Sequence, residues 1–262
     1  MYKRDYPENW NDWFDYFETN KDCLLDITFA DDDIISLQTK LCIGQSVAIF
    51  QLGESSEGRT FINKAREFVA RNGNQAYMKC LDLFIKEEHR HADNLKTFMN
   101  QQKIPVLRKQ WTDSCFRFLR KCLDLEIEIR VLICAELIAK VYYHSLYDAS
   151  HSPALKTICR QIMHDEDYHV QFQGQALALA KSAKDPMRQS LAHFFHYRVY
   201  NAAIAVVWMD HRSVLKSSGL SIFGFHKLCM REWQALQSDL KEHAKLFKKT
   251  TRWNQVTIRA EV

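Results

Sequence analysis

The stretch that decides the fold is "IKEEHRHADN", residues 85–94, in which Glu88 stands three positions before His91. A separation of three places two side chains on one face of a helix, close enough together to bind a single metal ion. One Glu-x-x-His pair is weak support for a metal site, because most such pairs are surface ion pairs or core histidines with satisfied hydrogen bonds. The pattern gains weight only if it recurs on a second helix.

It recurs once, in "MHDEDYHVQF" at residues 163–172, where Glu166 stands three positions before His169. The chain contains no third Glu-x-x-His, and the two pairs fall on two different predicted helices. Di-metal carboxylate sites in four-helix bundles use one such pair on each of two helices and a single glutamate on each of the other two. The two pairs therefore predict a di-metal site that requires one glutamate from each partner helix.

Helical periodicity dominates the rest of the chain, and no convincing alternating strand pattern is found. Helices are predicted over about 32–71, 74–102, 112–149, 153–183, 187–217 and 222–249, with a short extra helix within 7–22. The first four form two hairpins joined by a longer crossover, which is the layout of an all-α, ferritin-like four-helix bundle. The expected organisation is an N-terminal extension (1–32), the bundle (33–183), two accessory C-terminal helices packed on it (184–250) and a tail (251–262).

The second hairpin offers a partner glutamate at the right height. The number of residues from Glu136 to the break at Ser150 is almost the same as the number from Pro153 to Glu166. An equal rise along antiparallel helices brings the two glutamates level. Glu136 also lies in the apolar stretch "LICAELIAKVYY", where an unpaired charge would be costly.

The first hairpin offers two candidates, both within "QLGESSEGRT" at residues 51–60. The number of residues from Glu57 to the turn at 72–74 nearly equals the number from that turn to Glu88. Glu54 lies further from the turn. Height slightly favours Glu57, but both side chains point the same way because they are three positions apart. One is interpreted as a ligand and the other as a neighbouring carboxylate. The stretch from 53 to 58 carries no apolar side chain, and we interpret this gap as the place where the helix meets the metal site.

Four stretches, "LGESSEGR", "KEEHRH", "CAELIAK" and "HDEDYH", resemble the ligand helices of the ferritin-like di-iron carboxylate superfamily, which includes rubrerythrins and di-iron oxygenases. The resemblance covers roughly residues 35–183. In rubrerythrins the first ligand has a similar "GES" context, which favours Glu54. The resemblance implies two iron ions, or a Mn/Fe pair, held by Glu54, Glu88, His91, Glu136, Glu166 and His169.

Three further side chains are candidates around this site. Ligating histidines usually donate their other N–H group to a carboxylate, so Glu87 and Asp165 are each expected to orient the histidine of the opposite pair. The alternative is that both are surface acids that pair with Lys86 and Arg90. Tyr143 could line the pocket beside the metals or be ordinary core. The remaining histidines of residues 193–212 are interpreted as packing: His193, His196 and His211.

Composition narrows the environment and the partners. The chain has 262 residues, 47% hydrophobic, with no run of apolar residues long enough to span a membrane and no secretory signal. A net charge of +4 gives little support to nucleic-acid binding. Eight cysteines without a CxxC motif are typical of a reducing cytoplasm without structural disulfides.

The resemblance implies an enzyme, a di-iron oxidase or oxygenase that activates O₂ or peroxide on a small organic substrate. Electrons would come from an external donor, because the chain has no rubredoxin-like cysteines. One alternative is iron storage, iron handling or peroxide scavenging without an organic substrate. Another is a metal-free helical binding module, which would leave several ionisable groups buried and unpaired. The accessory helices could also form a homodimer face.

Overall fold

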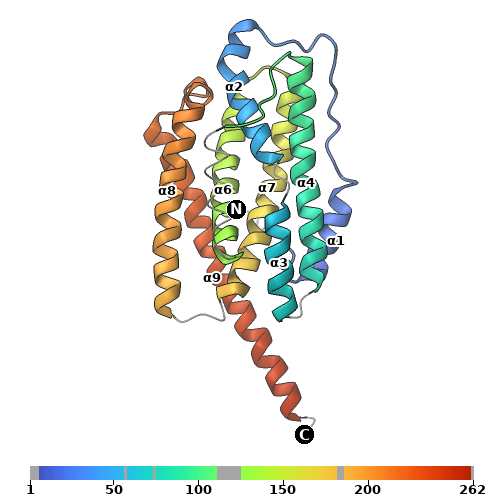
Figure 1. Cartoon of the computed structure of the whole chain (residues 1–262), viewed down its shortest axis with the longest axis vertical. Helices are drawn as coiled ribbons and strands as arrows, with labels where there is room; N and C mark the ends of the chain where they lie inside the picture. Colours follow the sequence, from blue (N-terminus) through green and yellow to red (C-terminus); the bar gives the residue numbers. More distant parts are fainter. Residues whose placement is uncertain (1–5, 56–57, 73–74, 111–124, 182–185, 261–262) are drawn as a thin grey trace.

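The computed structural model describes residues 6–55, 58–72, 75–110, 125–181 and 186–260, and within these ranges the chain forms helices and no strand (Figure 1). The expected all-α class is confirmed for this part of the chain. None of the helices in these ranges is both long and apolar enough to cross a membrane. The helices are α1 (Trp10–Asn20), α2 (Leu37–Glu54), α3 (Arg59–Asn72), α4 (Gln75–Gln101), α6 (Leu125–Ala149), α7 (Pro153–Lys181), α8 (Pro186–Ser217) and α9 (Ile222–Ala260).

The first predicted helix, 32–71, is wrong as a single element, because the structure has two helices there. α2 ends at Glu54, and the hydroxyl of Ser55 donates to the carbonyl of Leu52 and so bonds to the last turn. Gly58 has φ 61°, in the left-handed region that a helix cannot include and that glycine adopts without strain. α2 and α3 both pack on α4 and follow one another along it (Figure 1). The gap without apolar side chains therefore marks a break between two helices.

Two other predicted ends differ or lie outside the described residues. The last predicted helix ends at about residue 249, whereas α9 continues to Ala260, because residues 225–260 contain neither glycine nor proline. The predicted start of the third helix at Thr112 or Ser114 lies outside the described residues, and α6 is described from Leu125.

Two apolar cores lie at opposite ends of the bundle. As the molecule is drawn in Figure 1, the core at the lower end contains residues of α1 and α3 and is called the lower core. The core at the upper end contains residues of α2 and is called the upper core. α4 contributes to the lower core up to Ile85 and to the upper core from Leu95 onward, whereas α7 contributes to the upper core up to Ile162 and to the lower core from Val170 onward. These two helices therefore run in opposite directions, and each carries a polar stretch where it passes between the cores.

α6 is the central helix of the molecule. It packs against α7, α8 and α9 and also touches α2 and α3, so most of its residues are buried, including Glu136 in its middle. α8 covers α6 and α2, α9 covers α7 and α6, and α1 lies along α4. The two C-terminal helices thus pack on the outside of the group formed by α2, α3, α4, α6 and α7.

The break between α2 and α3 predicts opposite effects of alanine at its two glycines. Gly58→Ala is expected to lower the free energy of unfolding by about 1–2 kcal/mol, because an L-residue is strained at positive φ. The new Cβ would also lie 2.7 Å from Cδ1 of Ile85. Gly53→Ala is the matched control, since its Cβ meets nothing within 4 Å, and alanine is favoured over glycine inside a helix by about 1 kcal/mol. Urea unfolding of both variants measures the difference, and equal destabilisation by the two would contradict this assignment.

Candidate metal centre

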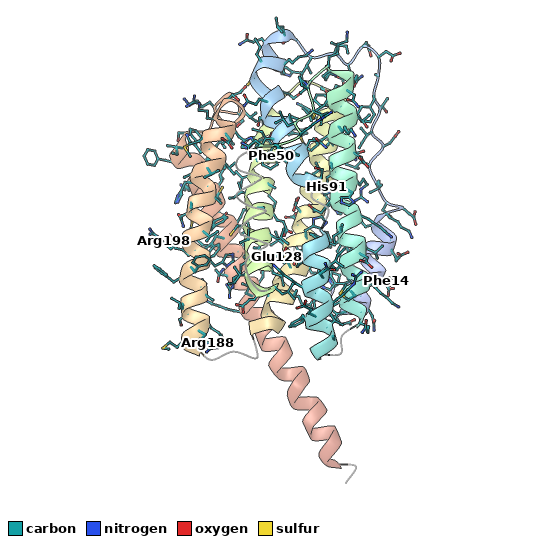
Figure 2. All side chains as sticks on the ribbon, in the orientation of Figure 1. Phe14, Phe50, His91, Glu128, Arg188 and Arg198 are labelled. Carbon is teal, nitrogen blue, oxygen red and sulfur yellow. The ribbon has the colours of Figure 1, made fainter. Side chains whose placement is uncertain are left out.

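Four side chains with metal-binding atoms converge in the polar layer between the two cores. They are Glu54 of α2, Glu88 and His91 of α4, and Glu166 of α7, and one ligand atom of each lies within 4.8 Å of every other. Glu88 is partly exposed and the other three are buried. Figure 2 shows His91 at mid-height of the bundle, below Phe50. The structure therefore brings together four of the six predicted ligands in one compact group.

His169 of α7 adjoins this group. Its Nδ1 atom lies 2.9 Å from Oε1 of Glu88 and 3.6 Å from Oε2 of Glu166. Although these two atoms are 2.9 Å apart, they do not form a hydrogen bond with each other: each lacks a hydrogen-bond partner among the described residues. Metal–ligand bonds of about 2.1 Å that meet at right angles place two ligand atoms roughly 3 Å apart. The contact thus has the spacing of two ligands directed at one ion rather than at each other.

Glu136 of α6 is the sixth predicted ligand. It lies outside the group of four but lines the same cavity as Glu54, Glu88 and Glu166. Its side chain is buried, and neither carboxylate oxygen has a hydrogen-bond partner among the described residues. An ionised carboxylate buried in this way costs several kcal/mol, so the site requires a cation or a proton there.

Buried atoms without a partner gather in this cluster. In native proteins such atoms are few, and each calls for a missing partner such as an ion. Carboxylate oxygens and imidazole nitrogens with free lone pairs suit divalent iron, manganese and zinc, so the donor set fits a transition metal. Among the described residues, the unpartnered atoms of the cluster are Oε1 of Glu88, Nδ1 of His91, both oxygens of Glu136, Oε2 of Glu166 and Nδ1 of His169.

A carboxylate of the other helix contacts Nε2 of each histidine, the ring nitrogen that faces away from the cluster. Nε2 of His91 lies 2.9 Å from Oδ2 of Asp165, and Nε2 of His169 lies 2.9 Å from Oε2 of Glu87. Both expected contacts are therefore present. Neither acid is at the surface, as the alternative required, although Arg90 does contact Asp165 at 2.9 Å and Glu87 at 3.4 Å. A carboxylate at Nε2 keeps the proton there and leaves Nδ1, on the cluster side, free to bind a metal.

Helix α1 links the two supporting carboxylates, which sequence reasoning missed. The amide of Asn20 donates to Oε1 of Glu87 at 2.6 Å and to Oδ1 of Asp165 at 3.1 Å. Gln161 of α7 also donates to Asp165, at 3.0 Å. The signal available in the sequence was weak: Asn20 continues the buried stripe of Trp10, Trp13 and Phe17, where a polar residue needs a partner.

Burial and the charges of neighbouring side chains shift the pKa values of the cluster. Burial raises the pKa of Glu54, Glu136 and Glu166, and neighbouring carboxylates raise it further. Burial also acts on Glu88, but the nearby imidazoles outweigh it and lower its pKa. Burial would lower the pKa of His169, yet the surrounding carboxylates outweigh burial and raise it. Without a cation the cluster must hold protons, and a divalent metal would displace them.

Tyr143 lies in the apolar core, the second of its two expected positions. It is fully buried, and it is not among the described residues that line the cavity. Its hydroxyl donates to Oε1 of Glu54 at 2.6 Å, so it fixes the orientation of that carboxylate. Glu57, the other candidate on the first predicted helix, lies outside the described residues.

A cavity of about 200 Å³ adjoins the four glutamates. Its walls come from α2, α3, α4, α6 and α8 and are mainly apolar, with Phe50, Phe61 and Phe84 among them. Gly53 and Gly58 also line it, so the break between α2 and α3 helps to make room beside the cluster. His211, interpreted from the sequence as packing, lines this cavity as well.

Comparison of the chain with models of protein families, with curated proteins and with solved structures finds no match. The resemblance to the ferritin-like superfamily therefore depends on the four sequence stretches and on the geometry of the cluster. In the described residues the structure shows helices without strands and a buried Glu/His cluster that could hold a metal.

Asp165→Asn is expected to weaken metal binding by about 10- to 100-fold, because the amide no longer holds His91 in the tautomer that leaves Nδ1 free. Asp167→Asn is the matched control, since Asp167 lies on the same helix but its carboxylate contacts Lys140, 2.7 Å away. Competition with a chromophoric chelator measures both affinities. An equal loss in the two variants would contradict the orienting role of Asp165.

Proposed function

We propose that this chain is a ferritin-like di-metal oxidoreductase, which binds two iron ions or a Mn/Fe pair between α2, α4, α6 and α7. It would use them with O₂ or peroxide to oxidise a small organic molecule. The observation that carries the proposal is the convergence of buried carboxylate and imidazole atoms that lack partners, with each imidazole held from behind by a carboxylate.

Two ions account for the arrangement better than one. Glu88 belongs to the group around His91 and also lies 2.9 Å from His169, so it is placed to be shared. Glu166 lies in the same group and 3.6 Å from His169. Glu54 and His91 would hold one ion, Glu136 and His169 would hold the other, and the remaining two glutamates would contribute to the same centre. Four carboxylates and two divalent cations give a neutral centre, which removes the cost of burying the charges.

A pair of redox-active ions, when bound, supplies the electrons for reaction with O₂ or peroxide. The chain's own residues set the conditions for that chemistry. Tyr143 keeps a proton on the hydroxyl that faces Glu54, and the Glu87 and Asp165 carboxylates keep the histidine protons away from the metal side. The walls of the cavity are mainly apolar, and the four glutamates, Asp210 and His211 are its polar side chains among the described residues.

The cavity favours an oxidase or oxygenase over the alternatives. Iron storage and peroxide scavenging need no space for an organic molecule beside the metals, whereas a 200 Å³ cavity with mainly apolar walls provides it. A metal-free binding module would keep the cluster's carboxylates buried without partners, which is energetically unfavourable. Electrons would come from an external donor protein.

The wild-type protein from iron-supplemented cells should contain about two equivalents of transition metal per chain. Glu166→Ala is expected to lose one or both, because it removes a carboxylate that would hold the metal. Glu67→Ala, an exposed glutamate of α3, is the matched control and should keep the wild-type content. Elemental analysis reads out all three proteins. Less than one equivalent in the wild type, or two in Glu166→Ala with an unchanged optical spectrum, would refute the proposal.

Ferrous iron loaded without oxygen should react rapidly when O₂ is admitted. An oxygen electrode is expected to record O₂ uptake comparable in amount to the iron bound. Small organic substrates should change the rate of O₂ uptake and be recovered in oxidised form. Light scattering on the same sample gives the size of the particle. Uptake of many irons per chain by a cage-sized assembly would favour storage, and no O₂ uptake by the loaded protein would contradict an oxygen-activating centre.

A further inference from the structure

We infer that the cavity beside the metal centre selects a neutral, largely apolar molecule that carries one hydrogen-bond acceptor, and that His211 donates the hydrogen bond. The inference rests on the proposed function, because it names the class of substrate that the centre would oxidise. It depends on three observations: the position of His211, the hydrogen bonds behind it, and the size and charge of the cavity.

His211 reaches the cavity from α8, outside the ligand helices. Its ring is buried and packs against Phe50, with ring centroids 4.8 Å apart, and against Tyr142, at 5.0 Å. The described residues that line the cavity include only two polar side chains apart from the four glutamates, namely His211 and Asp210. His211 is therefore in a position to meet the polar group of a bound molecule.

The hydrogen bonds behind His211 fix which ring nitrogen carries the proton. The buried hydroxyl of Tyr142 lies 2.8 Å from Oγ of Ser46, which is its hydrogen-bond partner in the described part of the chain. A buried hydroxyl proton needs an acceptor, so Tyr142 donates to Ser46. Ser46 has a single proton, which it then donates to Nδ1 of His211, 2.7 Å away.

Nδ1 of His211 is thus an acceptor, and the proton of the neutral ring lies on Nε2. Burial lowers the pKa of His211 to about 3, so the ring is neutral near pH 7. Nε2 has no hydrogen-bond partner among the described residues and, unlike the unpartnered atoms of the metal centre, it is not completely shielded from solvent. His211 lines the cavity, so we place this accessible nitrogen at the cavity wall. The wall therefore presents one N–H donor, which calls for an acceptor on the ligand.

Volume and charge narrow the ligand further. An apolar cavity of about 150 Å³ holds benzene, so about 200 Å³ suits a six-membered ring with a small substituent or an aliphatic chain of similar bulk. The carboxylate of Asp210 lies in the wall next to His211 and accepts a hydrogen bond from Gln110 at 3.0 Å. The described lining residues include no lysine or arginine that could pair with an anionic ligand. The acceptor is therefore a neutral oxygen, as in a ketone, an aldehyde or an ether.

A matched pair of probes tests this selection. Acetophenone carries a carbonyl oxygen, and α-methylstyrene has the same shape with a methylene group in its place. The two probes are titrated into metal-loaded protein in a calorimeter, without O₂ or reductant, so that no reaction occurs. Acetophenone should bind about tenfold more tightly than α-methylstyrene, because it forms one additional net hydrogen bond. His211→Phe should abolish the preference, whereas His193→Phe, an exposed position on the same helix, should retain it.

The outcomes separate this inference from the proposed function. Equal binding of the two probes by the wild type, or a preference that survives His211→Phe, would overturn the inference. Binding of neither probe by protein that holds two metals would also overturn it and leave the proposed function standing. A His211-dependent preference in protein that binds no metal would support the inference and contradict the proposed function.

Nitrogen-15 NMR keeps the test independent of whether His211→Phe folds. In wild-type protein loaded with diamagnetic zinc, the His211 signal should show a protonated Nε2 and an unprotonated Nδ1. Acetophenone should shift the Nε2 signal, and α-methylstyrene should shift it much less. A proton on Nδ1, or identical shifts with the two probes, would overturn the assignment of His211 as the donor.

Discussion

The structure depends on one constraint, the clustering of four carboxylates and two imidazoles, all buried except Glu88, between apolar cores. Such a group is unstable unless cations or protons balance its charge. The surrounding residues leave the cluster able to hold a metal: both imidazoles present Nδ1 to the cluster, because Glu87 and Asp165 occupy the opposite nitrogens. The hydrogen bonds of Asn20 and the ion pairs of Arg90 then hold these two acids in place.

The same constraint explains the departures from regular helix packing. The first predicted helix breaks beside the cluster, so that Glu54 ends α2 and the glycines around the break leave space for a cavity. α6, which contributes Glu136, is covered on nearly every side, and the accessory helix α8 supplies part of the cavity wall. α1 and α8, which lie outside the ligand helices, thus both contribute to the surroundings of the site.

Sequence reasoning succeeded where local geometry decides. The spacing within each Glu-x-x-His pair is fixed by the helix. Equal rise along two antiparallel helices led to Glu136, which lines the same cavity as Glu166 but lies outside the compact group of four. It also placed Glu87 and Asp165 behind the opposite histidines. It could not predict Asn20 or His211, because their partners depend on how α1 and α8 dock. The helix break was missed because the apolar periodicity continues on both sides of Gly58.

The central claim is that two metal ions lie between the histidine pairs, and anomalous X-ray diffraction from crystals of the iron-loaded protein tests it most directly. We predict two peaks about 3.5–4 Å apart, one beside Nδ1 of His91 and one beside Nδ1 of His169, with Glu88 and Glu166 between them. A diffraction map with no peak in this layer, or with iron only at the protein surface, would contradict it.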